Sequence, residues 1–257
     1  MSLELENYSY KELKSIYEEI SSDSNGKVEK TKKTKKDIID DIKYKMKLYE
    51  SYKKEKIDKY VSIEKLGAKG KDGLVYLVEC LDSKESKDSK IKYAMKTFRA
   101  NKSSKSIKEE ARLQKIAAKA GISPSIIEYD TVFNYIVMQK LDHNLLDIMK
   151  AQNKELTKTQ QNQLIKIFKK LDEILIFHSD PNPLNFMTKK NKMYIIDFGF
   201  AKEIDDKVIK KYGSTPNLSL MTLGFILKLK GLGCPITSYQ YMLPYLKQDD
   251  IEKFGLN

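Results

Sequence analysis

The hydrophobic pattern of this chain changes character partway along it, and that change limits the fold more than any other feature. Segments in which apolar and polar residues alternate come first, and such alternation over about four to eight residues predicts β-strands. These segments are residues 61–66, 73–80, 91–98, 126–130 and 135–141. The first three predict a meander, and a helix is expected over residues 106–120, before the fourth.

Beyond residue 141 the pattern becomes mainly helical. Apolar residues recur at helical spacing over residues 144–150, 157–177 and 218–230. Because strands come first and helices later, we expect an α+β fold with two lobes. The strand-rich lobe is placed at residues 59–141 and the helical lobe at residues 142–257.

The first 58 residues read as a separate, small helical module. Ser9 with Glu12, and Thr34 with Asp37, have the spacing of N-terminal capping boxes, and each pair opens a run with helical apolar periodicity. The segment between the two runs is polar and rich in lysine. The pattern therefore predicts a helix, a basic loop and a second helix.

Positive charge is in excess over the whole chain. There are 48 lysine and arginine residues against 36 aspartate and glutamate residues, which gives a net charge of +12. Such an excess favours anionic partners, including nucleic acid, although evenly spread lysines also describe an ordinary solvated surface. Six lysines lie within residues 27–36, so this cluster is the candidate nucleic-acid contact.

Nothing in the sequence predicts a membrane or secretory context. The first ten residues lack the basic and apolar regions of a secretory signal, and the apolar stretch at residues 218–229 is too short to cross a bilayer. Cys80 and Cys234 are far apart and lack metal-ligand spacing. We therefore expect an intracellular, cytoplasmic protein with no membrane partner and no disulfide scaffold.

Glycines cluster between the first two predicted strands. Gly67, Gly70 and Gly73 precede Val75 in a short loop. Glycine lets a backbone approach phosphate oxygens and offer N–H donors without a Cβ in the way. Taken alone, the cluster is more often an ordinary glycine-rich hairpin turn.

A lysine follows within the third predicted strand, in the sequence Ala94-Met-Lys96. A lysine on an apolar strand needs a partner or must protrude into water. Glu110, on the next predicted helix, is a suitable partner, and Glu109 could serve instead.

Two further motifs lie close together after the long helix. His178-Ser-Asp180 is followed by Asn185, and an apolar strand then ends in Asp197-Phe-Gly199. A carboxylate can orient and deprotonate an acceptor hydroxyl, and an amide oxygen with a second carboxylate can bind a cation that carries phosphates. Asp197-Phe-Gly199 alone would be an ordinary turn at the end of a strand, but its position after the motif of residues 178–185 is specific.

In this order the motifs resemble the protein-kinase superfamily, over residues 61–257. The resemblance implies ATP and Mg²⁺ as cofactors, Asp180 as catalytic base, and Lys96 held by Glu110 against the phosphates. It also implies that Asn185 and Asp197 bind the metal.

The same resemblance implies the nucleotide-binding residues. The three loop glycines and Lys96 would contact the phosphates, while Val75 and Ala94 line an adenine pocket. Met138 would be its gatekeeper, and the hinge between lobes would run from Gln139 to Leu141.

The chain departs from the kinase pattern in several places. Ala68 stands where the first loop glycine should be, Ser179 replaces the usual arginine, and Asn182 replaces a lysine. Ser219 stands in place of the usual aspartate of the central helix, and no Ala-Pro-Glu follows Gly199. The helical lobe is therefore expected to be truncated, and control by a phosphorylated activation loop is not expected.

These departures resemble compact, atypical kinases. Residues 109–124 are similar to a helix of the RIO and KEOPS-associated kinases, and residues 178–186 to kinases of iridoviruses and other large DNA viruses. For a viral protein the location would be a host cell or virion. Residues 178–185 also resemble choline and aminoglycoside kinases, which usually lack the Asp-Phe-Gly motif.

The sequence leaves three functions open. The first is a serine/threonine kinase with a protein substrate, the second a kinase for a small hydroxyl compound, and the third a pseudokinase or nucleic-acid scaffold. The N-terminal module resembles a SAP motif, which implies nucleic-acid binding through residues 27–36; the alternative is a helical hairpin that braces the strand-rich lobe.

Overall fold

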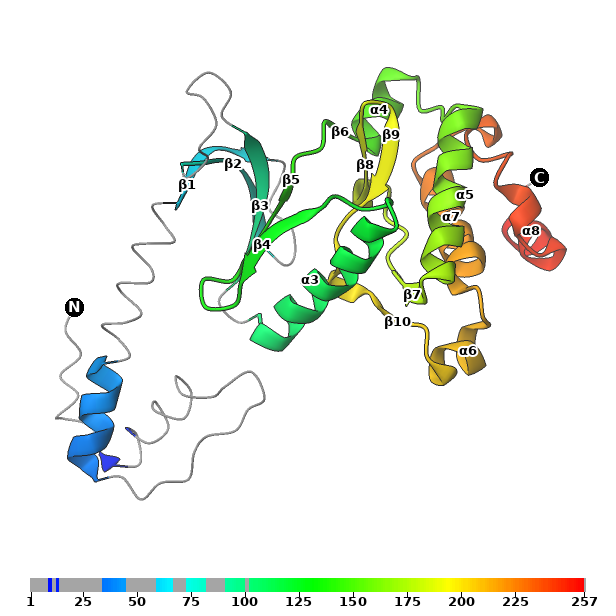
Figure 1. Ribbon diagram of the computed structural model, residues 1–257. Coiled ribbons are helices and arrows are strands. Elements are labelled where there is room, and N and C mark those ends of the chain that lie inside the picture. Colours follow the sequence, from blue (N-terminus) through cyan, green and yellow to red (C-terminus); the bar gives the residue numbers. More distant parts are fainter. Residues whose placement is uncertain are drawn as a thin grey trace. The chain divides into compact units, whose positions relative to one another are not determined.

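The computed structural model describes residues 9–10, 13, 34–44, 59–66, 73–81, 91–99 and 102–256 (Figure 1). The chain divides into two compact units, each described by itself below. One comprises Met1–Val61 and Glu79–Lys90, and the other Ser62–Val78 and Ile91–Asn257.

The described part of the first unit contains a short helix over residues 35–44. Asp37 N–H donates to Thr34 Oγ1 at 3.2 Å and Thr34 N–H donates to Asp37 Oδ2 at 2.9 Å, so the predicted second capping box is confirmed. Its apolar face buries Ile38, Ile39 and Ile42 together with Leu13. Glu12 of the first predicted box lies outside the described residues.

A five-stranded sheet carries the strand-rich part of the chain. Its strands lie in the order β1-β2-β3-β5-β4, with bounds Tyr60–Leu66, Gly73–Cys80, Lys92–Phe98, Tyr135–Gln139 and Ile126–Asp130 respectively. The five predicted strands and the initial meander are confirmed. β5 pairs antiparallel with β3, which sets Ala94 opposite Met138 and Lys96 opposite Ile136.

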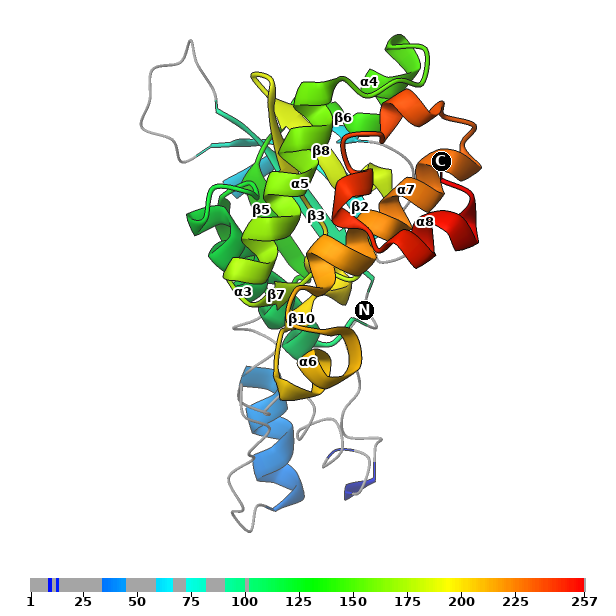
Figure 2. The same cartoon turned by 90° about the vertical axis from the view of Figure 1, so that its right-hand side faces the viewer.

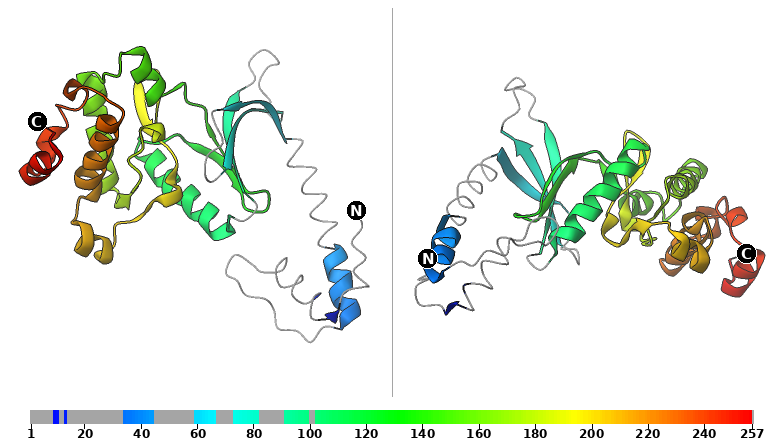
Figure 3. Two further views of the ribbon diagram at one scale, coloured as in Figure 1. Left: turned by 180° about the vertical axis from the view of Figure 1, so that it is seen from behind. Right: turned by 60° about the horizontal axis from the view of Figure 1, so that its bottom comes forward.

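Helix α3, Ser104–Lys119, lies against this sheet (Figure 3). It begins at the N-cap Ser103, whose side chain accepts from Ser106 N–H at 3.1 Å. Ile107 and Ala111 pack into the cluster formed with the sheet, whereas Leu113 and Ala117 pack into the larger core of the helical part. Since α3 belongs to both cores, its middle turn is fixed from two sides.

The rest of the chain is mainly helical with short strands between the helices. The longer elements are α4 Leu145–Ala151, α5 Lys158–Glu173, α6 Asp206–Tyr212, α7 Thr222–Gly231 and α8 Gln248–Phe254. The short strands are β6 His143–Asn144, β7 Ile176–Phe177, β8 Phe186–Lys189, β9 Lys192–Ile195 and β10 Lys202–Glu203. They form two small sheets, ordered β6-β8-β9 and β10-β7.

Three aromatic rings fill the centre of this part. Phe168 of α5 meets Phe186 of β8 edge to face, with ring centroids 5.8 Å apart, and Phe186 meets Phe225 of α7 at 5.3 Å. Phe168 and Phe225 also contact one another, so α5 and α7 pack side by side (Figure 2). The mixed α+β fold is confirmed.

Two predicted helix boundaries are wrong. The expected helix 157–177 ends at Glu173, because Leu175 adopts a left-handed φ of 56° and the next two residues pair with β10. The expected helix 218–230 begins at Thr222, after a wider π-helical turn over Asn217–Met221. No helix in the described ranges is long and apolar enough to span a membrane.

Candidate active site

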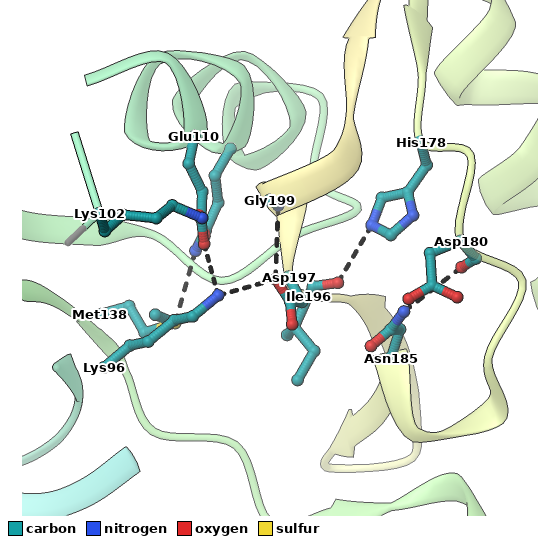
Figure 4. A network of polar contacts seen from close by, with 11 residues as sticks. Lys96, Lys102, Glu110, Met138, His178, Asp180, Asn185, Ile196, Asp197 and Gly199 are labelled. Carbon is teal, nitrogen blue, oxygen red and sulfur yellow. Dashed lines mark hydrogen bonds and ion pairs between the residues drawn. The ribbon is translucent and has the colours of Figure 1, made fainter. Parts of the chain in front are cut away.

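Lys96 of β3 lies between two carboxylates (Figure 4). Its Nζ is 2.6 Å from Glu110 Oε1 on α3 and 2.7 Å from Asp197 Oδ1 after β9. Lys96 is 8% exposed and Glu110 is 2% exposed. Residues separated by 14 and 101 positions in the sequence therefore converge on one buried cation.

Lys96 and Asp197 each favour the ionised form of the other. Burial acts to lower the pKa of Lys96, but the charges of Glu110 and Asp197 outweigh it and hold the pKa above its usual value. Burial likewise acts to raise the pKa of Asp197, but the charge and hydrogen bond of Lys96 outweigh it and hold that pKa below its usual value. Lys96 and Asp197 are therefore ionised at neutral pH.

The choice between Glu109 and Glu110 is settled by the helix face. Glu110 points inward to Lys96, and Lys102 Nζ lies 3.5 Å from its second oxygen. Glu109 faces outward and accepts from Arg112 at 2.7 and 2.9 Å. Arg112 also donates to Glu203 of β10 at 2.8 Å, which ties α3 to the segment after the Asp-Phe-Gly motif.

The backbone after β9 sets the position of Asp197. Ile196 N–H donates to the Asn185 carbonyl at 2.9 Å, so the segments that carry Asn185 and Asp197 lie side by side. Asp197 adopts a left-handed φ of 66°, a conformation costly for most residues and frequent at functional sites. Its Oδ1 accepts from Gly199 N–H at 3.3 Å as well as from Lys96.

Asp180 lies in the neighbouring loop, partly exposed. Its Oδ1 accepts from Asn182 N–H at 3.2 Å, and its backbone carbonyl accepts from Asn185 Nδ2 at 3.3 Å. Asn185 closes a short 3-10 turn, Pro183–Asn185, and is 7% exposed. The turn therefore fixes Asp180 and Asn185 relative to each other (Figure 4).

His178 is a structural residue rather than a proton carrier. Burial lowers its pKa, so the ring is neutral. Its Nε2 lies 3.1 Å from the Ile196 carbonyl, which can only accept, so Nε2 carries the proton. The ring packs edge to face on Phe198, with centroids 5.0 Å apart, and thereby joins the two loops.

Ser179, which replaces the usual arginine, also joins these loops. Its Oγ donates to the Phe200 carbonyl at 2.7 Å, and its backbone has a left-handed φ of 61°. The Ser179 hydroxyl thus holds the segment after Asp197 through a hydrogen bond between two uncharged groups.

Sequence reasoning missed Asn217, which is fully buried behind the loop. Its side-chain oxygen accepts from His178 N–H at 3.0 Å, and its Nδ2 donates to Asp172 Oδ1 and the Ile176 carbonyl, both at 2.7 Å. Ser219, expected to stand in place of an anchoring aspartate, instead donates to Thr215 within its own turn. The wide turn before α7 is what brings Asn217, rather than Ser219, to the loop.

Asp172 completes this buried network from the last turn of α5. It accepts from Asn217 N–H at 3.0 Å and from Leu218 N–H at 2.9 Å. Burial raises its pKa, although these N–H donors act against the rise. The sequence carried a signal: Asp172 lies four residues after Phe168 on the apolar face of α5, where a charge requires a partner.

The described residues assigned to nucleotide binding lie in β2, β3 and β5 or directly after β5. Gly67 and Gly70 are outside the described residues. At Gly73 an added Cβ would come within 1.8 Å of the Thr97 carbonyl, so no side chain fits there. Val75 lies in β2, and Ala94 faces Met138 across β3 and β5.

The proposed hinge begins at the end of β5. Gln139 is its last residue, and its N–H donates to the Ser125 carbonyl at 2.9 Å. Leu141 is buried beyond the strand. β5 therefore ends two residues earlier than predicted.

Asp197 and Asn185 fit a cation that is also held by phosphate oxygens. The bonds from Lys96 and Gly199 both go to Asp197 Oδ1, which leaves Oδ2 for a cation. Asn185 uses its Nδ2 toward Asp180, which leaves its oxygen. Two oxygen donors suit Mg²⁺, which usually keeps waters and phosphates as its other ligands. Among the described residues no group of three His, Cys, Asp or Glu side chains could hold a metal alone.

Comparison with known proteins gives one finding. A family model described as RIO domain matches residues 75–212, which is more than half of the 257 residues. The match lies within the kinase-like span of residues 61–257 expected from the motifs, and it confirms the resemblance to RIO kinases. No curated protein matches the chain. The viral and SAP-like resemblances stay predictions.

The matched range contains the residues of the polar network described above except Asn217, namely Lys96, Glu110, Asp172, His178, Asp180, Asn185 and Asp197, while Gly73 lies just before it. Its boundaries also enclose β3, α3 and the loop between β7 and β8, the elements that bring these side chains together. The chain therefore belongs to the RIO-domain family, an atypical protein-kinase-like family of ATP-using phosphotransferases.

Proposed function

We propose that this chain is a serine/threonine kinase that transfers the γ-phosphate of ATP to a hydroxyl group of a protein substrate. The observation that supports this most is the position of Lys96, held at 2.6 and 2.7 Å between Glu110 and Asp197. Burying a lysine with two carboxylate partners costs desolvation free energy, and hydrophobic residues of similar volume could fill the same space at no loss of stability. Phosphate binding would explain why the chain keeps this cluster of charged side chains.

Each side chain has a role in the proposed transfer. Lys96 binds phosphate oxygens, and Glu110 keeps its ammonium group pointed at them. Mg²⁺ bound with ATP would be held by Asp197 and Asn185 and would neutralise charge on the phosphates. Asp180, partly exposed beside Asn185, orients the acceptor hydroxyl and accepts its proton.

The loops around Asp180 are positioned without an arginine at residue 179. The Asn217 side-chain oxygen accepts from His178 N–H. The His178 ring donates to the Ile196 carbonyl, and the Ser179 hydroxyl donates to the Phe200 carbonyl. These bonds are made by neutral side chains, so none of them depends on a phosphorylated residue. This supports an enzyme that needs no activation-loop phosphorylation.

The nucleotide is proposed to bind against β2, β3 and β5. Ala94 and Met138, opposite each other in the sheet, would contact the adenine together with Val75. Backbone groups from Gln139 to Leu141 would bind its polar edge. The loop from Gly67 to Gly73 would cover the phosphates.

The test is transfer of label from γ-labelled ATP by the purified full-length chain. Generic protein substrates, small alcohols and the chain itself are offered as acceptors, with Mg²⁺ and with excess chelator. We expect labelled protein only when Mg²⁺ is present, and no label with Asp197→Ala. Labelling of small alcohols alone would replace the protein acceptor with a small one, and equal labelling in chelator would remove the metal assignment. Absence of both ATP binding and transfer would refute the proposed function.

A further inference from the structure

A buried glutamine of α3 contacts Met138 of the proposed nucleotide site. Gln114 is one turn after Glu110 on α3 and is 1% exposed. Its Nε2 donates to the Pro124 carbonyl at 3.2 Å and to the Met138 sulfur at 3.5 Å. Figure 4 shows Met138 in the same close-up as the Lys96–Glu110 pair.

The position is otherwise suited to an apolar side chain. The neighbouring inward residues of α3 include Ala111, Leu113 and Ala117, each fully buried. A buried amide destabilises the fold unless its donors are bonded. The two N–H groups of Gln114 match the two acceptors present, a carbonyl oxygen and a thioether.

The bond to sulfur restrains a side chain that is otherwise adaptable. Methionine is unbranched, has three rotatable bonds, and readily repacks into gaps. An N–H donor on α3 favours the Met138 rotamers that keep the sulfur at 3.5 Å, in the space between β5 and the helix. Because Pro124 fixes the same amide group from the other side, the donor itself cannot easily follow a moving sulfur.

We propose that Gln114 is a specificity-determining residue that keeps Met138 in place and so closes the space behind the adenine. This inference rests on the proposed function, in which Met138 and Ala94 contact the base. Gln114 does not touch the nucleotide and acts through Met138. An adenine nucleotide with a bulky group on N6 needs Met138 to move, and breaking the N–H···S bond makes that movement easier.

The experiment compares N6-benzyl-ADP with ADP binding to full-length variants by calorimetry, together with kcat/KM for the corresponding triphosphates. Gln114→Leu removes the donor, and Gln114→Met is the second variant because its unbranched chain keeps the packing volume. For both, the preference for ADP over the benzyl analogue should fall about 2- to 10-fold, with the factor for one ordinary neutral hydrogen bond as the upper limit because a thioether sulfur is a weak acceptor.

Gln161→Leu is the matched control. Gln161 is also fully buried, and its Nε2 donates to the Leu156 and Thr237 carbonyls at 2.8 and 2.7 Å, within the helical part of the chain. This variant loses these two bonds and the one that Gln161 Oε1 accepts from Tyr241 N–H at 3.0 Å, so it should lose stability, but its nucleotide preference should equal that of the wild type. Met138→Gly should accept the benzyl analogue, and adding Gln114→Leu to it should change nothing further.

The outcomes separate the inference from the function on which it rests. A wild-type chain that binds neither nucleotide contradicts the proposed function. A chain that binds ADP while both Gln114 variants keep the wild-type preference contradicts the role of Gln114. So does a preference that changes as much in Gln161→Leu, or that shifts again when Gln114→Leu is added to Met138→Gly.

Discussion

The buried network around Asn217 allows a quantitative prediction. Asn217→Ala removes three side-chain hydrogen bonds and leaves the His178 N–H and the Ile176 carbonyl without that partner in a fully buried place. Each buried polar group left unpaired costs about 1–3 kcal/mol, so two such groups give a loss of about 2–6 kcal/mol. This is a large part of the roughly 5–15 kcal/mol that stabilises a typical domain.

The assay is equilibrium unfolding in urea, followed by circular dichroism, with phosphate transfer measured on the same samples below the transition. The Asn217→Ala midpoint should fall at an unchanged slope, and kcat should fall because the His178 backbone is no longer held. Ser219→Ala is the control, since its hydroxyl bonds only within its own turn. A loss of less than about 1 kcal/mol in Asn217→Ala, or an equal loss in Ser219→Ala, would refute the anchoring role.

Asn217→Asp tests the same network through its charge. The new carboxylate would lie where Nδ2 now donates to Asp172 Oδ1 at 2.7 Å, so two carboxylates would share one site. Like charges at this distance raise the pKa of the pair in the folded state above its value in the unfolded chain. The folded state then binds more protons, so the free energy of unfolding should increase from pH 7 to pH 5 relative to the wild type. No difference in pH dependence would contradict this geometry.

Three further predictions address catalysis, pH and the N-terminal module. Asp180→Asn should lower kcat about 10²–10⁴-fold with little change in nucleotide affinity, measured by steady-state kinetics and calorimetry, and wild-type kcat would place the base elsewhere. Burial lowers the pKa of His178, so the unfolded chain takes up an extra proton as the pH falls below about 6.5, and the free energy of unfolding should decrease there. His178→Gln should weaken this decrease in urea titrations at pH 7 and pH 5, and an unchanged decrease would assign it to other groups. If residues 27–36 bind duplex DNA, the slope of log K against log salt should be no steeper than about −5 for at most six lysines, and deleting residues 1–58 should abolish binding but not phosphate transfer. Absence of salt-dependent DNA binding at low ionic strength would reject the nucleic-acid role.

Short-range patterns predicted most of the strands and the order of the motifs. Alternation over 73–80 and 91–98 was sufficient because each strand has an apolar face and a glycine or polar loop beside it. The apolar run Ile174–Phe177 was misread as helix because buried strands and helices cannot be distinguished by periodicity alone. The last two residues of this run pair with Lys202–Glu203, which begins 25 residues after Phe177. Pairing between segments so far apart in the sequence depends on tertiary structure.

In the candidate site, too, some residues could be predicted from the sequence and others could not. Lys96, Asp180 and Asp197 could be found from motifs, because each type of residue has a chemical role at a recognisable spacing. The choice of Glu110 over Glu109 required the rotation of α3, which Ile107 and Ala111 set by packing on the sheet. Asn217 could not be found by spacing, because the turn that brings it to His178 departs from regular helix.

The most direct test of the account compares Glu110→Gln with Glu109→Gln in the rate of γ-phosphate transfer. The two residues are adjacent on α3, but Glu110 binds buried Lys96 at 2.6 Å while Glu109 binds exposed Arg112 at 2.7 Å. A hydrogen bond to a charged group contributes about 1.5–3 kcal/mol, and an exposed ion pair about 0.2–1 kcal/mol. Glu110→Gln should therefore lower kcat/KM for ATP about 10- to 150-fold, and Glu109→Gln no more than about fivefold. Equal effects, or a larger loss in Glu109→Gln, would contradict the claim that Lys96, Glu110 and Asp197 form the phosphate-binding centre.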